Sequence, residues 1–227
     1  MPDVDQQTVE MGLAQADIEA LEGIVRAFRH EDAISIKQLE TKGWDGILAT
    51  NHDLRSCELW LRRKFEQVGL GDKVEWIHFG CTSEDVNNIA YGLMLRDAVD
   101  ALMEPLQAVA DWLQGSARQF AQLPMLSRTH GQPATPTTLG KEFAIFDGRL
   151  RRQMQQIASL KVALKLNGAS GNYAAMHAAL PAVDWPQFAQ AFIENGTYLP
   201  RGAHLSFAFN PITTQIEPHD TTRNSSE

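Results

Sequence analysis

The sequence predicts a mainly α-helical protein that contains the first long helices of an elongated helical bundle. Apolar residues recur at helical spacing over most of the chain, and only short glycine- and proline-rich segments interrupt them. The longest such run extends from about Ser83 to Ala121. At a rise of about 1.5 Å per residue, a helix of this length measures about 55 Å, which suits an extended bundle better than a compact core.

The N-terminal part is predicted to be helical up to a loop that precedes the long run. Apolar residues from Leu13 to about Thr41 recur at roughly helical spacing. A further helix is predicted to begin near Asn51 or Asp53 and to end at the glycines of residues 69–71. Residues 75–82 are predicted to form a short loop.

The long run begins with a capping-box-like pair and is followed by a stretch rich in proline. Thr82 and Asp85 have the spacing of a capping box, and Pro105 is expected to kink the helix. The prolines and Gly131 of residues 124–136 predict an irregular loop. The remaining segments are predicted as a third long helix over 138–163, a turn region over 164–173, a helix over 184–194 and a short strand within 204–216.

Composition and charge exclude several classes of function. The formal net charge of the 227 residues is −8, and no cluster of lysine and arginine suggests a nucleic-acid-binding surface. No apolar stretch is long enough to span a membrane, and no leader peptide is recognisable. Cys57 and Cys81 are the only cysteines, so no disulfide framework is expected. We therefore expect a soluble cytoplasmic protein that binds neither nucleic acid nor membrane.

Four short polar segments lie where a helix is predicted to begin or a loop to bend. The first three contain a histidine close to a hydroxyl or amide side chain, and the unperturbed imidazole pKa of about 6.5 allows proton transfer near neutral pH. His130 follows Thr129 and precedes two prolines, so a stiff loop is expected to hold its imidazole against a ligand. The segments are Thr-Asn-His-Asp at 50–53, His-Phe-Gly-Cys-Thr-Ser-Glu-Asp at 78–85, Ser-Arg-Thr-His-Gly-Gln-Pro-Ala-Thr-Pro at 127–136 and Thr-Thr-Gln-Ile-Glu-Pro-His-Asp at 213–220.

Each of these residues also has a purely structural interpretation. A lone histidine such as His130 commonly satisfies backbone groups between two helices. Cys81 lies three residues from His78, but no second pair follows at the spacing of metal ligands, so no metal site is expected. Helix N-capping is an alternative role, compatible with ligand contact, for the polar side chains at the predicted helix starts, namely Asn51, Asp53, Thr82 and Ser83.

The ordered set of segments resembles the bacterial-type adenylosuccinate lyases of the aspartase/fumarase superfamily. The resemblance extends from about Ala14 to Asp220 and is carried most specifically by Leu-Ser-Arg-Thr-His-Gly-Gln-Pro-Ala-Thr-Pro. It implies a fumarase/aspartase-like fold and a homotetramer that needs no cofactor. It also implies a β-elimination that releases fumarate from adenylosuccinate, forming AMP, and from the succinyl-carboxamide ribotide of purine biosynthesis.

The resemblance assigns roles to individual residues. His130 corresponds to the general acid that protonates the leaving nitrogen. Asn51, His52 and Asp53 correspond to substrate contacts, and His52 also helps to orient the acid. Thr82 and Ser83 correspond to residues that bind a substrate carboxylate, and Gln215 corresponds to a residue that holds the nucleotide part of the substrate. His78 corresponds to a residue that supports the site from behind the residues that touch the substrate.

The sequence also departs from the family pattern. The usual Gly-Arg-Tyr segment and the loop Ser-Ser-x-Met-Pro-x-Lys-x-Asn-Pro, whose serine serves as the base, are absent from these 227 residues, and residues 43–46 resemble a short insertion. We expect an N-terminal helical domain over 1–82, the first part of a central bundle domain over 83–220 and a divergent polar tail over 221–227. The chain is therefore predicted to be truncated and inactive alone.

Two other functions remain compatible with the sequence. The chain could be a non-catalytic helical remnant or an assembly partner of an intact lyase, although joint retention of His52, Ser83 and His130 argues against long-standing loss of function. It could also be another lyase of the superfamily, such as an argininosuccinate lyase. The segments Cys-Thr-Ser-Glu-Asp and Thr-Gln-Ile-Glu-Pro-His-Asp favour adenylosuccinate.

Overall fold

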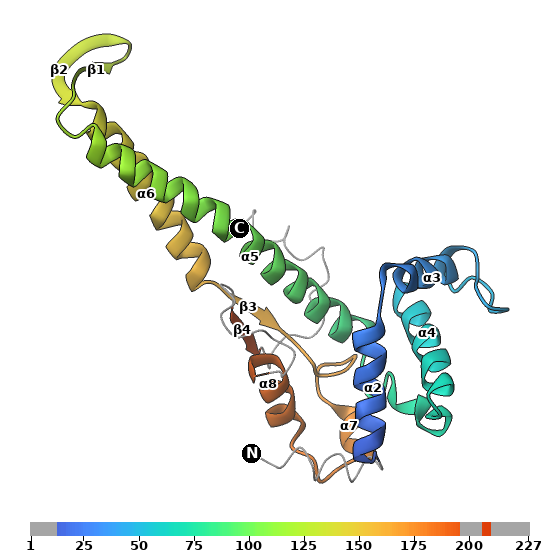
Figure 1. Cartoon of the computed structure of the whole chain (residues 1–227). Coiled ribbons are helices and arrows are strands. Elements are labelled where there is room, and N and C mark those ends of the chain that lie inside the picture. The colour runs from blue at the N-terminus through green and yellow to red at the C-terminus, as the bar shows by residue number, and fades with distance from the viewer. Residues whose placement is uncertain (1–12, 196–205, 210–227) are drawn as a thin grey trace, which may run out of the picture. The chain divides into compact units, whose positions relative to one another are not determined.

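The computed structural model describes residues 13–195 and 206–209, and most of these residues are helical (Figure 1). The chain divides into two compact units, Met1–Ser83 and Glu84–Glu227. The prediction of a mainly α-helical fold is confirmed.

The first unit contains helices α2 (Gln15–Ala27), α3 (His30–Thr41) and α4 (Asp53–Gln67), followed by the short 3₁₀ helix η1 (Gly71–Trp76). The predicted helical stretch from Leu13 to Thr41 is divided into two helices at Phe28 and Arg29. The Arg29 backbone N–H donates to the Asp32 carboxylate at 2.9 Å and so caps α3. The Arg29 guanidinium donates to the carbonyls of Arg26 and Phe28, which satisfies the end of α2.

Boundaries in the rest of the first unit agree closely with the prediction. Helix α4 begins at Asp53 and ends just before the glycines that were expected to end it. The predicted loop over 75–82 begins two residues later, because Glu75 and Trp76 belong to η1. Trp60 of α4 is 3% exposed, and its ring meets that of Phe28 edge to face. These aromatic contacts hold α4 against the end of α2.

The second unit is built around the long helices α5 (Ser83–Gln119) and α6 (Leu139–Ser159), which run side by side (Figure 1). Pro105 lies within α5 without ending it. Met103 and Ala110 of α5 pack with Met154 of α6, and partly buried aliphatic side chains surround them. Nearer the connection between the helices, Trp112 meets Phe143 edge to face. Leu106 packs against this seam, whereas Leu102 and Val109, which belong to the apolar periodicity that predicted α5, are exposed.

The prediction of an irregular loop between α5 and α6 is wrong. Strands β1 (Pro124–Thr129) and β2 (Gln132–Thr138) form an antiparallel hairpin that continues from the end of the two helices (Figure 1). The two-residue turn between them has positive φ at both positions, which matches the twist of paired strands. Prolines are tolerated because each strand of a two-stranded sheet has a free edge.

The second unit also differs from the prediction beyond α6. The helix ends at Ser159, and Lys161–Leu164 forms strand β3, which pairs in parallel with β4 (Ser206–Phe209). A short apolar run does not distinguish helix from strand, and the strand partner lies more than 40 residues away. The short helix α7 (Ala174–Ala179) was not predicted, whereas α8 (Trp185–Asn195) agrees closely with the predicted helix over 184–194.

Gly140 allows the closest approach between α6 and the end of α5. A Cβ atom at this position would lie 2.4 Å from the Ala117 carbonyl oxygen and 2.7 Å from the Ala121 backbone. Because the obstacles are backbone atoms, Gly140→Ala is expected to lower the free energy of unfolding by about 1–3 kcal/mol. Urea unfolding followed by circular dichroism measures this change.

Gly148 provides the matched control for that prediction, because it lies in the same helix with nothing within 4 Å of a built Cβ. Gly148→Ala is expected to raise the free energy of unfolding by about 0.5–1 kcal/mol through helix propensity alone. Equal effects of the two substitutions would contradict the close approach at Gly140.

Candidate functional site

His130 lies at the tip of the β1–β2 hairpin, in the first of the two turn positions. Its φ is +51° and that of Gly131 is +76°, and the imidazole is exposed. The Arg128 guanidinium donates to the Gly131 carbonyl at 3.1 Å, and the Ser127 hydroxyl donates across the hairpin to the Thr135 carbonyl. The turn therefore holds the backbone of His130 while leaving its side chain available to a ligand.

The backbone conformation of His130 independently suggests a functional role. Turns of this type favour asparagine or glycine at the first position, because other side chains are strained at positive φ. Strained residues of this kind concentrate at functional sites. The imidazole at this strained position is therefore a candidate functional group.

Asn51, His52 and Asp53 lie together at the start of α4, and all three side chains are exposed. Asn51 has a φ of +50°, and its backbone N–H donates to the Glu40 carbonyl at 3.0 Å. His52 is the N-cap residue of α4, so the cap prediction made for Asn51 and Asp53 belongs to the histidine between them. The three polar side chains thus project from one helix end.

The Nδ1 atom of His52 has two neighbours that require different protonation states. It lies 3.4 Å from the Arg55 backbone N–H, which needs a lone pair on Nδ1. It also lies 3.1 Å from Asp53 Oδ1, which needs a proton on Nδ1. Only one of these hydrogen bonds forms at a time, and in the capped form the remaining proton of a neutral imidazole sits on Nε2. Nε2 is then a donor for a ligand.

A pair of hydroxyls, one buried and one partly buried, supports this helix end. Ser56 is fully buried, and its Oγ lies 2.5 Å from Thr50 Oγ1. The His52 carbonyl oxygen lies 2.9 Å from Ser56 Oγ and 3.0 Å from Thr50 Oγ1, and the two hydroxyl protons serve these three contacts between them. The backbone of His52 is therefore fixed from the inside of the unit. Thr50 belongs to the quoted segment, but nothing in the sequence distinguishes Ser56 from an ordinary helix residue.

Thr82 and Ser83 lie at the start of α5, where the sequence placed them, and both are partly buried. His78 lies in the turn before them, and its carbonyl accepts from the Cys81 backbone N–H at 3.3 Å. Gln215 lies outside the described residues. The described candidates thus form groups at the start of α4 and around the start of α5, with His130 at the hairpin tip.

A buried polar network ties the first turn of α5 to the segment that follows β3. Asp85 is fully buried, and its Oδ1 lies 2.5 Å from Nζ of Lys165, whose side chain is 5% exposed. Nζ also donates to Asn167 Oδ1 at 3.0 Å and to the Gly168 carbonyl at 3.3 Å. The Asp85 carboxylate accepts in addition from the backbone N–H groups of Asn167 and Gly168. The pair is thus surrounded by hydrogen bonds.

Asn88 strengthens the same connection one turn further along α5. Its Oδ1 accepts from the Lys165 backbone N–H at 2.9 Å, and its Nδ2 donates to the Lys165 carbonyl at 3.1 Å. Local sequence patterns place Asp85 in a capping box and residues 164–173 in a turn, so they do not predict this network. The two partners are 80 residues apart, and no local pattern links them.

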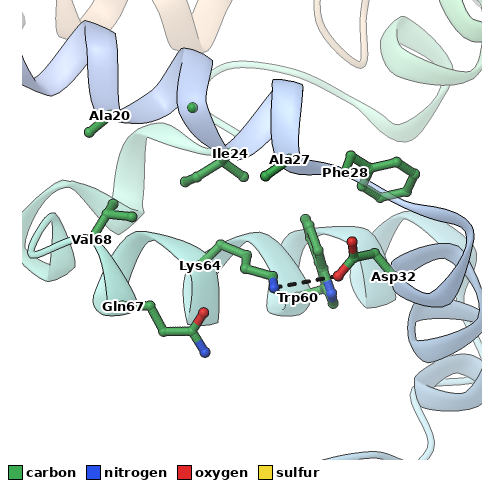
Figure 2. Close-up of a pocket in the computed structure, with 10 residues that line it drawn as sticks. Ala20, Ile24, Ala27, Phe28, Asp32, Trp60, Lys64, Gln67 and Val68 are labelled. Carbon is green, nitrogen blue, oxygen red and sulfur yellow. Dashed lines mark ion pairs between the residues drawn. The ribbon is translucent and has the colours of Figure 1, made fainter.

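A pocket of about 280 Å³ lies in the first unit, and none of the candidate site residues lines it. Figure 2 shows Ala20, Ile24 and Ala27 of α2 facing Lys64 and Val68 of α4. Lys64 Nζ lies 3.4 Å from Asp32 Oδ1 and 4.9 Å from the centre of the Trp60 ring. Most residues that line the pocket are therefore apolar, and the Lys64 ammonium group is already paired with the Asp32 carboxylate.

Metal-binding and membrane-spanning features are absent from the described residues. Within 13–195 and 206–209, no cluster of three or more histidine, cysteine, aspartate or glutamate side chains could hold a metal ion. Over the same residues, no helix combines the length and the apolar character that crossing a membrane requires.

Cys57 offers a test of the local electrostatics around α4. Burial raises the pKa of its thiol, and the negative charge of Asp53 raises it further. Because the thiolate is the reactive form, we expect iodoacetamide to alkylate Cys57 more slowly in the folded protein than in the urea-unfolded chain at about pH 8. The free energy of unfolding should correspondingly fall as the pH rises from the ordinary pKa of a thiol to the raised pKa of Cys57, because the unfolded chain releases the thiol proton first. Mass spectrometry of quenched samples measures both rates, and equal rates would contradict the burial.

The long paired helices α5 and α6 agree with the predicted fumarase/aspartase-like fold. The chain belongs to the lyase family described as "Lyase", which matches residues 4–220. The recognition of this relationship from the sequence is confirmed.

Relatives and solved structures agree with this membership. The adenylosuccinate lyase of Escherichia coli strain K12 is 43% identical over 202 residues, covering 88% of this chain and 41% of the relative. The adenylosuccinate lyase of Vibrio cholerae is 42% identical over 202 residues, which again cover 88% of this chain and 41% of the relative. The crystal structure of 3-carboxy-cis,cis-muconate lactonizing enzyme from Pseudomonas putida has a TM-score of 0.59 at 27% identity, covering 76% of this chain and 38% of that one. The chain thus spans about two fifths of the length of the relatives it matches.

Proposed function

We propose that this chain carries the proton-donating part of an adenylosuccinate lyase site. The observation that carries the proposal is the 43% identity to the E. coli enzyme over 88% of the chain. The matching family region includes the start of α4, the start of α5 and the hairpin tip. The substrates are adenylosuccinate and the succinyl-carboxamide ribotide, each of which releases fumarate.

The reaction breaks a carbon–nitrogen bond by β-elimination. A base removes a proton from the carbon adjacent to the one that bears nitrogen, and the released electron pair forms the double bond of fumarate. The carbon–nitrogen bond breaks, and its electrons go to the nitrogen, which takes a proton from a general acid. His130 fits this last role, because its imidazole is exposed at the end of a braced turn.

The other candidates provide polar contacts of the kinds that the substrate needs. Asn51 and His52 offer an amide and an Nε2–H donor at the start of α4, next to Asp53. Thr82 and Ser83 provide hydroxyls at the start of α5, where the helix dipole favours a carboxylate. We assign Gln215 to the nucleotide part and His78 to supporting the segment before α5.

The proposed function also implies a cellular location, an oligomeric state and a cofactor requirement. We expect a cytoplasmic homotetramer without a cofactor, and we expect the 227-residue polypeptide by itself not to turn over substrate. This expectation is supported by the matched share, because the chain spans 41% of the E. coli relative. The serine-containing loop that supplies the base in the resembled family does not occur within these residues.

A chimera tests the proposal without depending on activity of the short polypeptide. The region of the E. coli enzyme that matches this chain is replaced by the corresponding residues of this chain, and fumarate release from adenylosuccinate is measured. The chimera is expected to be active, and the 227-residue polypeptide is the matched control. A folded, tetrameric chimera without activity would contradict the proposed function.

The two alternatives give different results in related experiments. An argininosuccinate lyase would release fumarate from argininosuccinate in the same chimera. A non-catalytic assembly partner would bind the intact E. coli enzyme in a pull-down but leave the chimera inactive.

A further inference from the structure

The carboxylate of Asp85 introduces a negative charge at a position where the proposed function requires an anion to bind. Asp85 is fully buried in the first turn of α5, two residues after Ser83. Like charges repel, and the repulsion is larger where water is excluded. A substrate carboxylate at Thr82 and Ser83 therefore needs the Asp85 charge to be cancelled.

Lys165 supplies the cancelling charge. Its Nζ lies 2.5 Å from Asp85 Oδ1, and both side chains are buried. The pair is neutral as a whole, so the positive end of the α5 dipole remains available to an anion. Stability alone gives a poor reason for such a pair, because buried ion pairs can often be replaced by apolar groups without loss.

The same network also fixes the geometry of the helix start. The Asp85 carboxylate accepts from two successive backbone N–H groups, those of Asn167 and Gly168. Asn88 holds the Lys165 backbone through both its N–H and its carbonyl. The first two turns of α5 are thus attached to residues 165–168. A displacement of that segment would move the start of α5, and Ser83 with it.

We propose that Lys165 is a positioning residue that neutralises Asp85 and fixes the first turn of α5, so that Thr82 and Ser83 can bind a substrate carboxylate. The proposal rests on the proposed function for the identity of the anion. The electrostatic part can be tested without substrate, because Cys81 lies directly before Thr82 and reports the local charge through its reactivity.

The first experiment uses the full 227-residue chain with Cys57→Ala, which leaves Cys81 as the only cysteine. The rate of iodoacetamide alkylation is measured against pH for the parent, Lys165→Met, Asp85→Asn and the double variant. Lys165→Met should raise the midpoint pH by roughly half a unit, because the Asp85 charge is then uncompensated. Asp85→Asn should lower it by a similar amount, and the double variant should return it to the parent value.

Opposite shifts from the two single variants are the distinguishing result, because loosened packing alone would move both in one direction. Shifts of the same sign, or no shifts in folded variants, would overturn the proposal. Circular dichroism checks folding. If Lys165→Met does not fold, Asp85→Asn and the double variant carry the test, since asparagine keeps the shape of aspartate. His78 and Glu84 are unchanged throughout, so their charges cancel in the comparison.

The second experiment places the same three variants in the chimera. Lys165→Met should raise the KM for adenylosuccinate about tenfold with a smaller effect on kcat, and the double variant should recover most of the loss. An inactive parent chimera would count against the proposed function while leaving the alkylation result intact. An active chimera in which the double variant is no better than Lys165→Met would overturn the positioning role alone.

Discussion

Replacing His130 with alanine in the active chimera is expected to lower kcat for fumarate release by about 10²–10⁴-fold. The reason is chemical, because the leaving nitrogen would depart without a proton from a positioned acid. The KM should change less, since the imidazole acts mainly in the transition state. Steady-state measurement of fumarate release gives both constants.

His130→Asn is the matched control for this prediction. Asparagine followed by glycine is the preferred sequence for a two-residue hairpin turn, so this variant should keep the turn with its positive φ values. It lacks an imidazole, so its kcat should fall as far as that of His130→Ala. If His130→Asn retained the parent rate, the histidine would serve the turn and another group would be the acid.

Lys165→Met is expected to lower the free energy of unfolding of the 227-residue chain by about 3–5 kcal/mol. The substitution leaves the Asp85 carboxylate buried without its cation, although the N–H groups of Asn167 and Gly168 still bind it. Asp85→Asn combined with Lys165→Met should recover much of the loss, because no uncompensated charge remains. Urea unfolding followed by circular dichroism measures the parent and both variants.

Lys141→Met provides the surface control. Lys141 pairs with Glu142 at 2.5 Å, but 48% of the lysine side chain is exposed. Exposed pairs of this kind contribute little, so the free energy of unfolding should change by less than about 1 kcal/mol. If Lys141→Met and Lys165→Met lowered the free energy of unfolding by similar amounts, burial of the Asp85–Lys165 pair would not increase its contribution to stability.

Helical periodicity predicted the parts of the fold that local sequence determines. The start of α5 at Ser83 and the start of α4 at Asp53 follow from apolar stripes and helix-start signals that lie within a few residues. The hairpin was missed because its prolines usually indicate loops, whereas its formation depends on the backbone conformation of His130 and Gly131. Strand β3 was missed because its partner, Ser206–Phe209, is distant in the sequence.

The candidate site was only partly visible in the sequence for a related reason. Histidines in polar segments carry a chemical signal, so His52 and His130 could be noted as candidates from the residues, whereas their roles came from the family resemblance. Lys165 carries no such signal, because its role depends on burial against Asp85 across 80 residues of chain. Ser56 likewise carries no signal in the sequence, because its role depends on the contact between its hydroxyl and the His52 carbonyl.

The most direct test of the account is a fumarate-release assay on the chimera with adenylosuccinate and argininosuccinate side by side. We expect release from adenylosuccinate only, and a loss of that release when His130 is replaced by asparagine. Release from argininosuccinate alone, or release from adenylosuccinate that is unaffected by the His130 substitution, would contradict it.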